Sequence, residues 1–226
     1  MSSALQSIAP IARKETLGTM VREKLRAALM AGRFQPGEKL AIRAVAAALD
    51  VSLTPAREAL YNLMAEGVLE ANATGTIYVP ELDTAKINEL RRIRVSLECM
   101  AATEALQNLT DEDIKKILEI NKAICEADHT REFSKLMELN WMFHFTIYEA
   151  SKMPMLIRII ESCWLKMGSY LNVIYPYYGE DGKGIDLHDR VCAAIVARDA
   201  LALNEAIAED ITQACDWMIN RISAKT

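Results

Sequence analysis

The chain contains three histidines, His129, His144 and His188, whose side chains can take several chemical roles. Asn140 precedes His144 by four residues, so the two side chains share one face of a helix. An imidazole can ligate a divalent ion, bind the carboxylate of a small ligand, or remain a neutral, hydrogen-bonded core residue. The residues alone leave these three interpretations open.

A second candidate site is the short segment 51–60. Ser52 or Thr54 can cap a helix N-terminus there, and Pro55 suits the first turn. Apolar residues recur behind them at helical spacing, at Ala56, Leu60, Leu63 and Met64. Thr54 and Arg57 are then left pointing outward near the helix start. A hydroxyl and a guanidinium in this position suit the major groove of DNA, although an ordinary solvated face is the alternative.

Arg94 and Glu98 are also four residues apart in a region of helical pattern. As an exposed surface pair they would contribute only about 0.3–0.5 kcal/mol to stability. If Arg94 faces a cavity instead, its guanidinium can hold a ligand carboxylate through two parallel hydrogen bonds.

The elements that position these side chains fall into two groups. In the first group, helical periodicity covers three segments, at about 17–31, 42–49 and 53–67. Two β-prone runs follow, at 68–71 and 76–79. Asn72 and Gly75 lie between the runs and suit positive φ. Three helices and a β-hairpin are typical of a winged helix-turn-helix, which we predict over residues 16–80, behind a flexible arm at 1–15.

The second group, residues 81–226, is predicted to be all-helical. No glycine lies between Gly75 and Gly168, and no proline between Pro80 and Pro154, which favours uninterrupted helices. Periodicity predicts a bundle of about six helices, at about 84–107, 110–128, 130–150, 153–175, 185–197 and 200–223. One long loop is expected at 175–184. The predicted fold class is therefore mainly α.

Charge is distributed unevenly between the two groups. The chain carries a net charge of −5, yet residues 1–80 hold nine Lys or Arg against seven Asp or Glu. The first group is thus weakly basic and the rest of the chain carries −7. This asymmetry fits a nucleic-acid-binding module attached to an acidic one.

The five cysteines are widely spaced, contain no Cys-x-x-Cys, and are expected to be reduced core thiols. The first ten residues lack the basic start and apolar run of a signal peptide. No stretch approaches the roughly 18 uninterrupted apolar residues of a membrane span. We therefore expect a cytoplasmic protein that makes no use of a membrane.

Three segments, in this order and spacing, resemble the GntR family of bacterial transcription regulators: Ala31–Leu40, Val51–Leu60 and Leu63–Leu69. The helical remainder resembles the FCD domain of the family's fatty-acid-regulator-like branch. The resemblance implies a homodimer that binds a palindromic operator in double-stranded DNA and usually represses. It also implies that a small organic acid binds the helical domain, which serves dimerisation as well, and changes the affinity for DNA.

Within the winged part, the resemblance implies DNA contacts from six residues: Arg43, Thr54, Arg57, Thr74, Gly75 and Thr76. Leu53 departs from the family, which usually has Arg there. The loss of one cation removes at most a few kcal/mol of contact, so we expect weaker or altered operator reading and not its loss.

The FCD branch commonly holds a divalent ion with Asp-x-x-x-His on one helix and a His on each of two others. Asn140, His144, His188 and Asp210 match these four positions, with Asn replacing Asp and Asp replacing the last His. Two imidazoles and one carboxylate still suit zinc, nickel or manganese, and the total ligand charge is unchanged. Arg94 matches the family's Arg-x-x-Leu-Glu, and it is expected to bind the effector together with His144 and His188.

We therefore predict a ligand-responsive transcription regulator that is not an enzyme. A metal-dependent enzyme that carries a DNA-binding module is one alternative. The helical part shows no Ser/His/Asp order, phosphate loop or paired carboxylates, which argues against it. An effector-independent DNA-binding protein is the other alternative. Two polar helix faces are expected to point into one cavity, which argues mildly against this effector-independent alternative.

Overall fold

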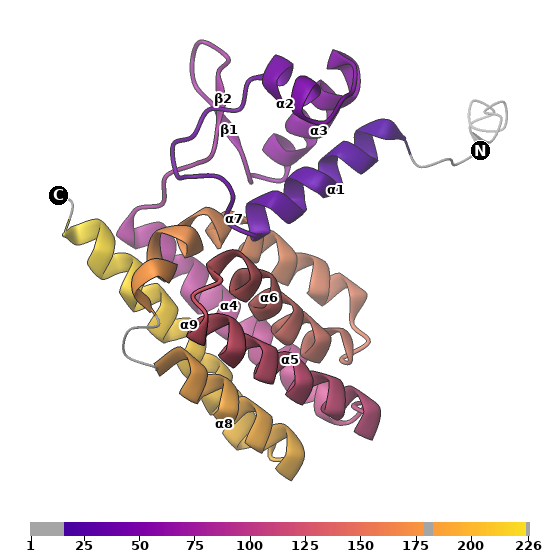
Figure 1. Cartoon of the computed structure of the whole chain (residues 1–226), viewed down its shortest axis with the longest axis vertical. Helices are drawn as coiled ribbons and strands as arrows, with labels where there is room; N and C mark the ends of the chain where they lie inside the picture. Colours follow the sequence, from indigo (N-terminus) through magenta and orange to yellow (C-terminus); the bar gives the residue numbers. More distant parts are fainter. Residues whose placement is uncertain (1–15, 179–182, 225–226) are drawn as a thin grey trace, which may run out of the picture.

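The computed structural model describes residues 16–178 and 183–224, and the predicted arm at 1–15 lies outside them (Figure 1). Three helices come first: α1 (Leu17–Met30), α2 (Ile42–Ala48) and α3 (Leu53–Ala65). β1 (Glu70–Ala71) and β2 (Ile77–Tyr78) then pair as an antiparallel hairpin, with Glu70 opposite Tyr78 and Ala71 opposite Ile77. The prediction of a winged helix-turn-helix fold is confirmed.

Local sequence explains how this part forms. The hydroxyl of Thr16 accepts a hydrogen bond from the Thr19 N–H and so caps α1. The apolar faces of α1, α2 and α3 and the inner side of the hairpin bury one shared core, which includes Leu25, Leu60 and Ile77. Burying these faces together leaves the opposite side of α3 in solvent.

Two local predictions in this part need correction. Ser52 is the N-cap residue of α3, but its side chain makes no capping hydrogen bond, and Thr54 lies inside the helix. Gly75 has the predicted positive φ of 78°, whereas Asn72 is not among the residues with positive φ. The Asn72 side chain instead accepts hydrogen bonds from the N–H groups of Thr74 and Thr76. An asparagine can stabilise a turn through its side chain without changing its own backbone region.

Six helices form the second part, as predicted: α4 (Thr84–Leu106), α5 (Asp111–His129), α6 (Phe133–Glu149), α7 (Pro154–Tyr178), α8 (Lys183–Ala197) and α9 (Ala200–Ser223). They bury a second apolar cluster, distinct from that of the winged part. Within this bundle, α4 and α8 both pack against α9, and α5 packs against α6. None of the described helices combines the length and the apolarity that a membrane span requires.

The predicted long loop at 175–184 overlaps two helices of the structure. Helix α7 continues to Tyr178 and α8 begins at Lys183, and residues 179–182 of the predicted loop lie outside the described residues. The predicted end of the helix at about residue 175, just before Pro176, is therefore wrong. A proline beyond the first turn removes one backbone donor and crowds the carbonyl group one turn earlier, which is why an end is predicted there. Helix α7 nevertheless continues for two residues past Pro176.

Helix α7 joins the two parts of the molecule. Leu165 of α7 belongs to the buried core of the winged part. Gly168, one turn later, lies so close to the carbonyl group of Leu29 in α1 that a Cβ atom would overlap with it. Arg26 of α1 forms ion pairs with Glu66 at 2.7 Å and with Glu161 of α7 at 3.1 Å. Apolar packing and charge pairing therefore both hold α1 on α7.

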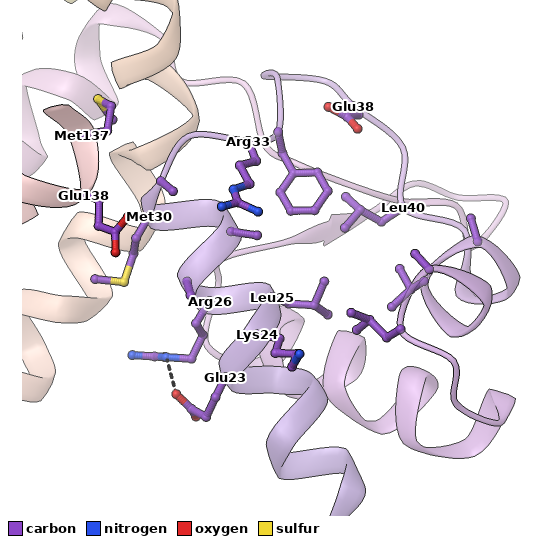
Figure 2. Close-up of a pocket in the computed structure, with 18 of the residues that line it drawn as sticks. Glu23, Lys24, Leu25, Arg26, Met30, Arg33, Glu38, Leu40, Met137 and Glu138 are labelled. Atoms are coloured by element: carbon purple, nitrogen blue, oxygen red, sulfur yellow. Dashed lines mark ion pairs between the residues drawn. The ribbon is translucent and has the colours of Figure 1, made fainter. Parts of the chain in front are cut away.

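A groove of about 870 Å³ lies beside this contact (Figure 2). Helices α1 and α2 of the winged part line one side, and Met137, Glu138 and Trp141 of α6 line the other. In Figure 2, Met30 and Arg26 project from α1 toward the helical part, on the side where Met137 and Glu138 lie. The groove marks where the two parts diverge beyond the α1–α7 contact.

The close approach of α7 to α1 predicts opposite outcomes for two helical Gly→Ala substitutions. Alanine raises helix propensity by about 1 kcal/mol at either site. At Gly168 the new methyl group meets the backbone of Leu29, so we expect a net loss of about 1–3 kcal/mol in the free energy of unfolding. At Gly18 the one tight contact is with the flexible end of the Glu58 side chain, so stability should stay equal or rise. Urea unfolding of both variants tests this, and equal effects would contradict the packing described.

Candidate functional site

Three helices bring His144, His188 and Asp210 together in the core of the helical part. One possible ligand atom from each of the three side chains lies within 4.8 Å of the others. His144 Nε2 lies 3.3 Å from Asp210 Oδ2, and His188 Nε2 lies 3.9 Å from Asp210 Oδ1. Both imidazoles are buried, and the Asp210 side chain is 14% exposed. The structure thus assembles three of the four predicted ligands into one cluster.

The fourth predicted ligand, Asn140, lies one helical turn before His144 on the buried face of α6. Helical spacing places the two side chains on the same side, as expected from the sequence. His129, in contrast, is exposed at the last residue of α5 and does not belong to the cluster.

Aromatic rings hold the two imidazoles in place. Phe143 stacks on His188, with centroids 4.5 Å apart. Trp164 of α7 lies against His144, with centroids 5.3 Å apart. The two imidazoles themselves meet edge to face at 5.2 Å. Such close packing limits ring rotation, so the ring nitrogens keep fixed directions.

The electrostatics favour the forms that a metal ligand requires. Burial, together with nearby His144, lowers the pKa of His188 to about 4, although Asp210 opposes this shift. Burial acts to raise the pKa of Asp210, but the hydrogen bond and charge of His144 and the charge of His188 outweigh it, so the pKa is lowered. At neutral pH the cluster therefore presents a neutral His188 beside an ionised Asp210.

A buried chain of polar contacts runs from α4 to this cluster. The guanidinium of Arg94 donates to both oxygens of Glu98, from Nε at 2.6 Å and from Nη2 at 3.3 Å. The Tyr148 hydroxyl donates to Glu98 Oε2 at 2.8 Å. Its oxygen lies 3.1 Å from His144 Nδ1. Burial, and then the charge of Glu98, raise the pKa of Tyr148 well above its ordinary value.

The interpretation of Arg94 and Glu98 as an exposed surface pair is wrong, since their side chains are only 7% and 0% exposed. Burial alone would lower the pKa of Arg94, but Glu98 outweighs burial and raises it. The guanidinium also lies 4.6 Å above the Trp164 ring, and its Nη1 lies 3.7 Å from Met167 Sδ. Trp164 therefore contacts both Arg94 and His144.

Sequence reasoning missed Tyr148 altogether. The available signal was its position four residues after His144, on a helix whose buried face already carried Asn140. A tyrosine on such a face usually finds a partner for its hydroxyl group.

Five of the six residues expected to contact DNA are exposed. Arg43 on α2, and Thr54 and Arg57 at the start of α3, are exposed, as are Thr74 and Gly75 at the hairpin tip. Thr76 is half-buried. Leu53, the first residue of α3, is 42% exposed. Helices α2 and α3 and the hairpin share one end of the molecule, opposite α5 and α8 (Figure 1).

Comparisons with known proteins agree with this architecture. Residues 17–79 match the family described as bacterial regulatory proteins, gntR family, and residues 89–213 match the FCD domain. The HTH-type transcriptional regulator McbR of Escherichia coli (strain K12) is 30% identical over 200 residues, covering 88% of this chain and 90% of that protein. The gluconate operon transcriptional repressor of Bacillus subtilis (strain 168) is 25% identical over 226 residues, covering 94% and 91%.

Solved structures agree as well. The structure of E. coli McbR/YncC superimposes with a TM-score of 0.87 at 29% identity, covering 92% of this chain and 100% of that one. McbR and the gluconate operon repressor are both named as transcriptional regulators. The chain therefore belongs to the GntR family of bacterial transcriptional regulators, with a winged helix-turn-helix domain followed by an FCD domain.

Proposed function

We propose that this regulator is a homodimeric, cytoplasmic repressor that binds a palindromic operator and senses a small carboxylate metabolite in its FCD domain. The observation that carries the proposal is the buried His144–His188–Asp210 cluster beside the guanidinium of Arg94. Buried charged groups are either paired or coordinate a metal, and this cluster gathers three possible ligand atoms in one place. The gluconate operon relative is named as a repressor, which supports the proposed direction of control.

The proposed DNA contacts begin at the exposed N-terminal end of α3. Thr54 and Arg57 enter the major groove there, Arg43 contacts the flanking backbone, and residues 74–76 of the hairpin reach the DNA as a wing. Leu53 stands beside Thr54 as an exposed apolar group. It can contact bases only through van der Waals interactions, so the operator should differ from those read by an arginine at this position.

The cluster suits a divalent ion such as zinc, nickel or manganese, held by His144, His188 and Asp210, with Asn140 as a weaker fourth ligand. Two ligand atoms at about 2.0–2.1 Å from a tetrahedral ion lie roughly 3.3–3.4 Å apart. The separation of His144 Nε2 and Asp210 Oδ2 is 3.3 Å. When bound, such an ion supplies a Lewis-acidic anchor for a carboxylate oxygen.

Arg94 offers the complementary half of an effector site. Glu98 engages its Nε and Nη2, while within the described part of the chain the partner of Nη1 is the weak acceptor Met167 Sδ. A buried guanidinium with unused N–H groups favours a carboxylate ligand. We propose that the effector bridges Arg94 and the His144/His188 cluster.

Helix α7 supplies the physical connection between this site and DNA binding. Trp164 contacts both His144 and Arg94, and the next residue, Leu165, is buried in the core of the winged part. A ligand that moves Trp164 therefore changes the packing of α7 on α1. We propose that this change alters the spacing of the two winged domains on the operator half-sites.

For the DNA contacts, we expect Arg57→Ala to weaken binding to an operator selected from a random duplex library by about 10- to 100-fold, because one good side-chain contact to a base contributes about 1–3 kcal/mol of discrimination. Lys115→Ala, which removes the same charge from an exposed site on α5, should leave binding unchanged. Fluorescence anisotropy at one salt concentration measures both. Unchanged specific binding by Arg57→Ala would exclude this orientation of α3.

For the metal site, we expect the purified chain to bind about one equivalent of Zn²⁺ or Ni²⁺, measured by calorimetry after chelator treatment. His144→Ala and Asp210→Ala should each abolish this binding, since each removes a ligand from a cluster of three. His129→Ala is the matched control, because this exposed histidine lies outside the cluster. Equal loss in all three variants would point to non-specific binding by surface groups.

For the effector, a thermal-shift screen of small carboxylic acids, with and without chelator, should identify an acid that stabilises the protein. At a concentration of 100 Kd, binding contributes about 2.7 kcal/mol, which raises Tm by roughly 5–10 °C in a domain of this size. His144→Ala should lose the shift. If no acid raises Tm and operator binding is insensitive to every acid in both proteins, the effector proposal fails and effector-independent DNA binding is favoured.

A further inference from the structure

We propose that Glu98 and Tyr148 are positioning residues for His144: they keep a hydrogen on its Nδ1, so that Nε2 is left open toward Asp210 for a cation. This inference rests on the proposed metal site. It assigns a role to two residues that are not themselves ligands. It also explains why a carboxylate and a phenol are buried together behind an imidazole.

The geometry is a linear series of three contacts. Tyr148 Oη lies 2.8 Å from Glu98 Oε2, His144 Nδ1 lies 3.1 Å from Tyr148 Oη, and His144 Nε2 lies 3.3 Å from Asp210 Oδ2. Each group touches the next within hydrogen-bonding distance, and three of the four groups, Glu98, Tyr148 and His144, are buried. Water therefore does not compete freely for these positions.

The hydrogens of this series can be assigned from its two inner contacts. Glu98 is an acceptor, and the Tyr148 hydroxyl donates its one hydrogen to it at 2.8 Å. The Tyr148 oxygen then meets His144 Nδ1 as an acceptor, so a ring hydrogen of His144 belongs on Nδ1. Nε2 is the ring nitrogen that faces Asp210 Oδ2, and these two atoms can share a cation.

Arg94 fixes which group donates and which accepts in this series. It donates to both oxygens of Glu98, at 2.6 and 3.3 Å, and thereby holds the carboxylate as an acceptor for the Tyr148 hydroxyl. With its own hydrogen committed to Glu98, the Tyr148 oxygen can only accept from His144 Nδ1. Fixing the ring hydrogen of a metal-binding histidine through its other nitrogen is the usual role of an outer carboxylate, and here a tyrosine transmits it.

The alternative is that Glu98 and Tyr148 only join α4 to α6. The two roles predict different results for removal of the Tyr148 hydroxyl. In the positioning role, the ring hydrogen on Nδ1 of His144 loses its acceptor and moves to Nε2, where Asp210 Oδ2 lies 3.3 Å away among the residues that the structure describes. A cation must displace that hydrogen before it can bind. In the joining role, stability falls but cation affinity does not.

The first test is Zn²⁺ titration calorimetry of Tyr148→Phe in the full chain. We expect an affinity about 10- to 100-fold below that of the unmodified protein. Tyr170→Phe is the matched control, because Tyr170 is also buried and its hydroxyl bonds to the backbone of Leu82, away from the cluster. Tyr170→Phe should retain full affinity. Equal affinity in Tyr148→Phe and Tyr170→Phe would overturn the proposal.

The second test reads the hydrogen directly and needs no bound metal. NMR of isotope-labelled histidine, at a pH above the ordinary histidine range, should show His144 protonated at Nδ1 in the unmodified protein and at Nε2 in Tyr148→Phe. A hydrogen on Nε2 in the unmodified protein would overturn the proposal even if Tyr148→Phe fails to fold. If the unmodified protein shows the Nδ1 hydrogen but binds no Zn²⁺, the proposed metal site is wrong. Glu98 and Tyr148 then have no role in cation binding, and this inference is overturned as well.

Discussion

The helical domain depends on one constraint: a series of charged and polar groups is buried in its core and must satisfy itself. Arg94, Glu98, Tyr148, His144 and Asp210 lie in contact one after another and come from α4, α6 and α9. Removing any inner member would leave a buried partner without its hydrogen bond, at a cost of about 1–3 kcal/mol or more for a charged group. The packing of these helices is therefore specified by polar contacts as well as by apolar ones.

This buried series also explains why α7 occupies its position. Trp164 covers the guanidinium of Arg94 and the ring of His144 on one side of the helix. Leu165 and Gly168 face the winged domain on another side. Because neighbouring residues of a single rigid helix belong to two different cores, neither core can be rearranged without affecting the other. The helical domain and the winged domain are thus connected mechanically across a short distance.

The order of the elements was predictable because each is encoded locally. Helical periodicity located the six described helices of the second part, and the absence of glycine and proline supported the first three of them, α4, α5 and α6. The errors came where one residue has two possible uses. Asn72 stabilises its turn through its side chain instead of adopting positive φ. Pro176 lies within the last turn of α7, although a proline there removes a backbone donor. The residue type alone does not predict which of the two conformations occurs, because that depends on the conformation of the neighbouring backbone.

The sequence by itself determined which side chains share a helix face: Asn140 with His144, and Arg94 with Glu98, since helical spacing is a local property. It could not determine that Arg94 and Glu98 are buried, because burial depends on what packs over the pair. Only the tertiary structure joined Tyr148 to Glu98, fifty residues apart in the chain, and Asp210 to both imidazoles. Contacts between helices depend on how those helices cross, and no spacing within one helix specifies that.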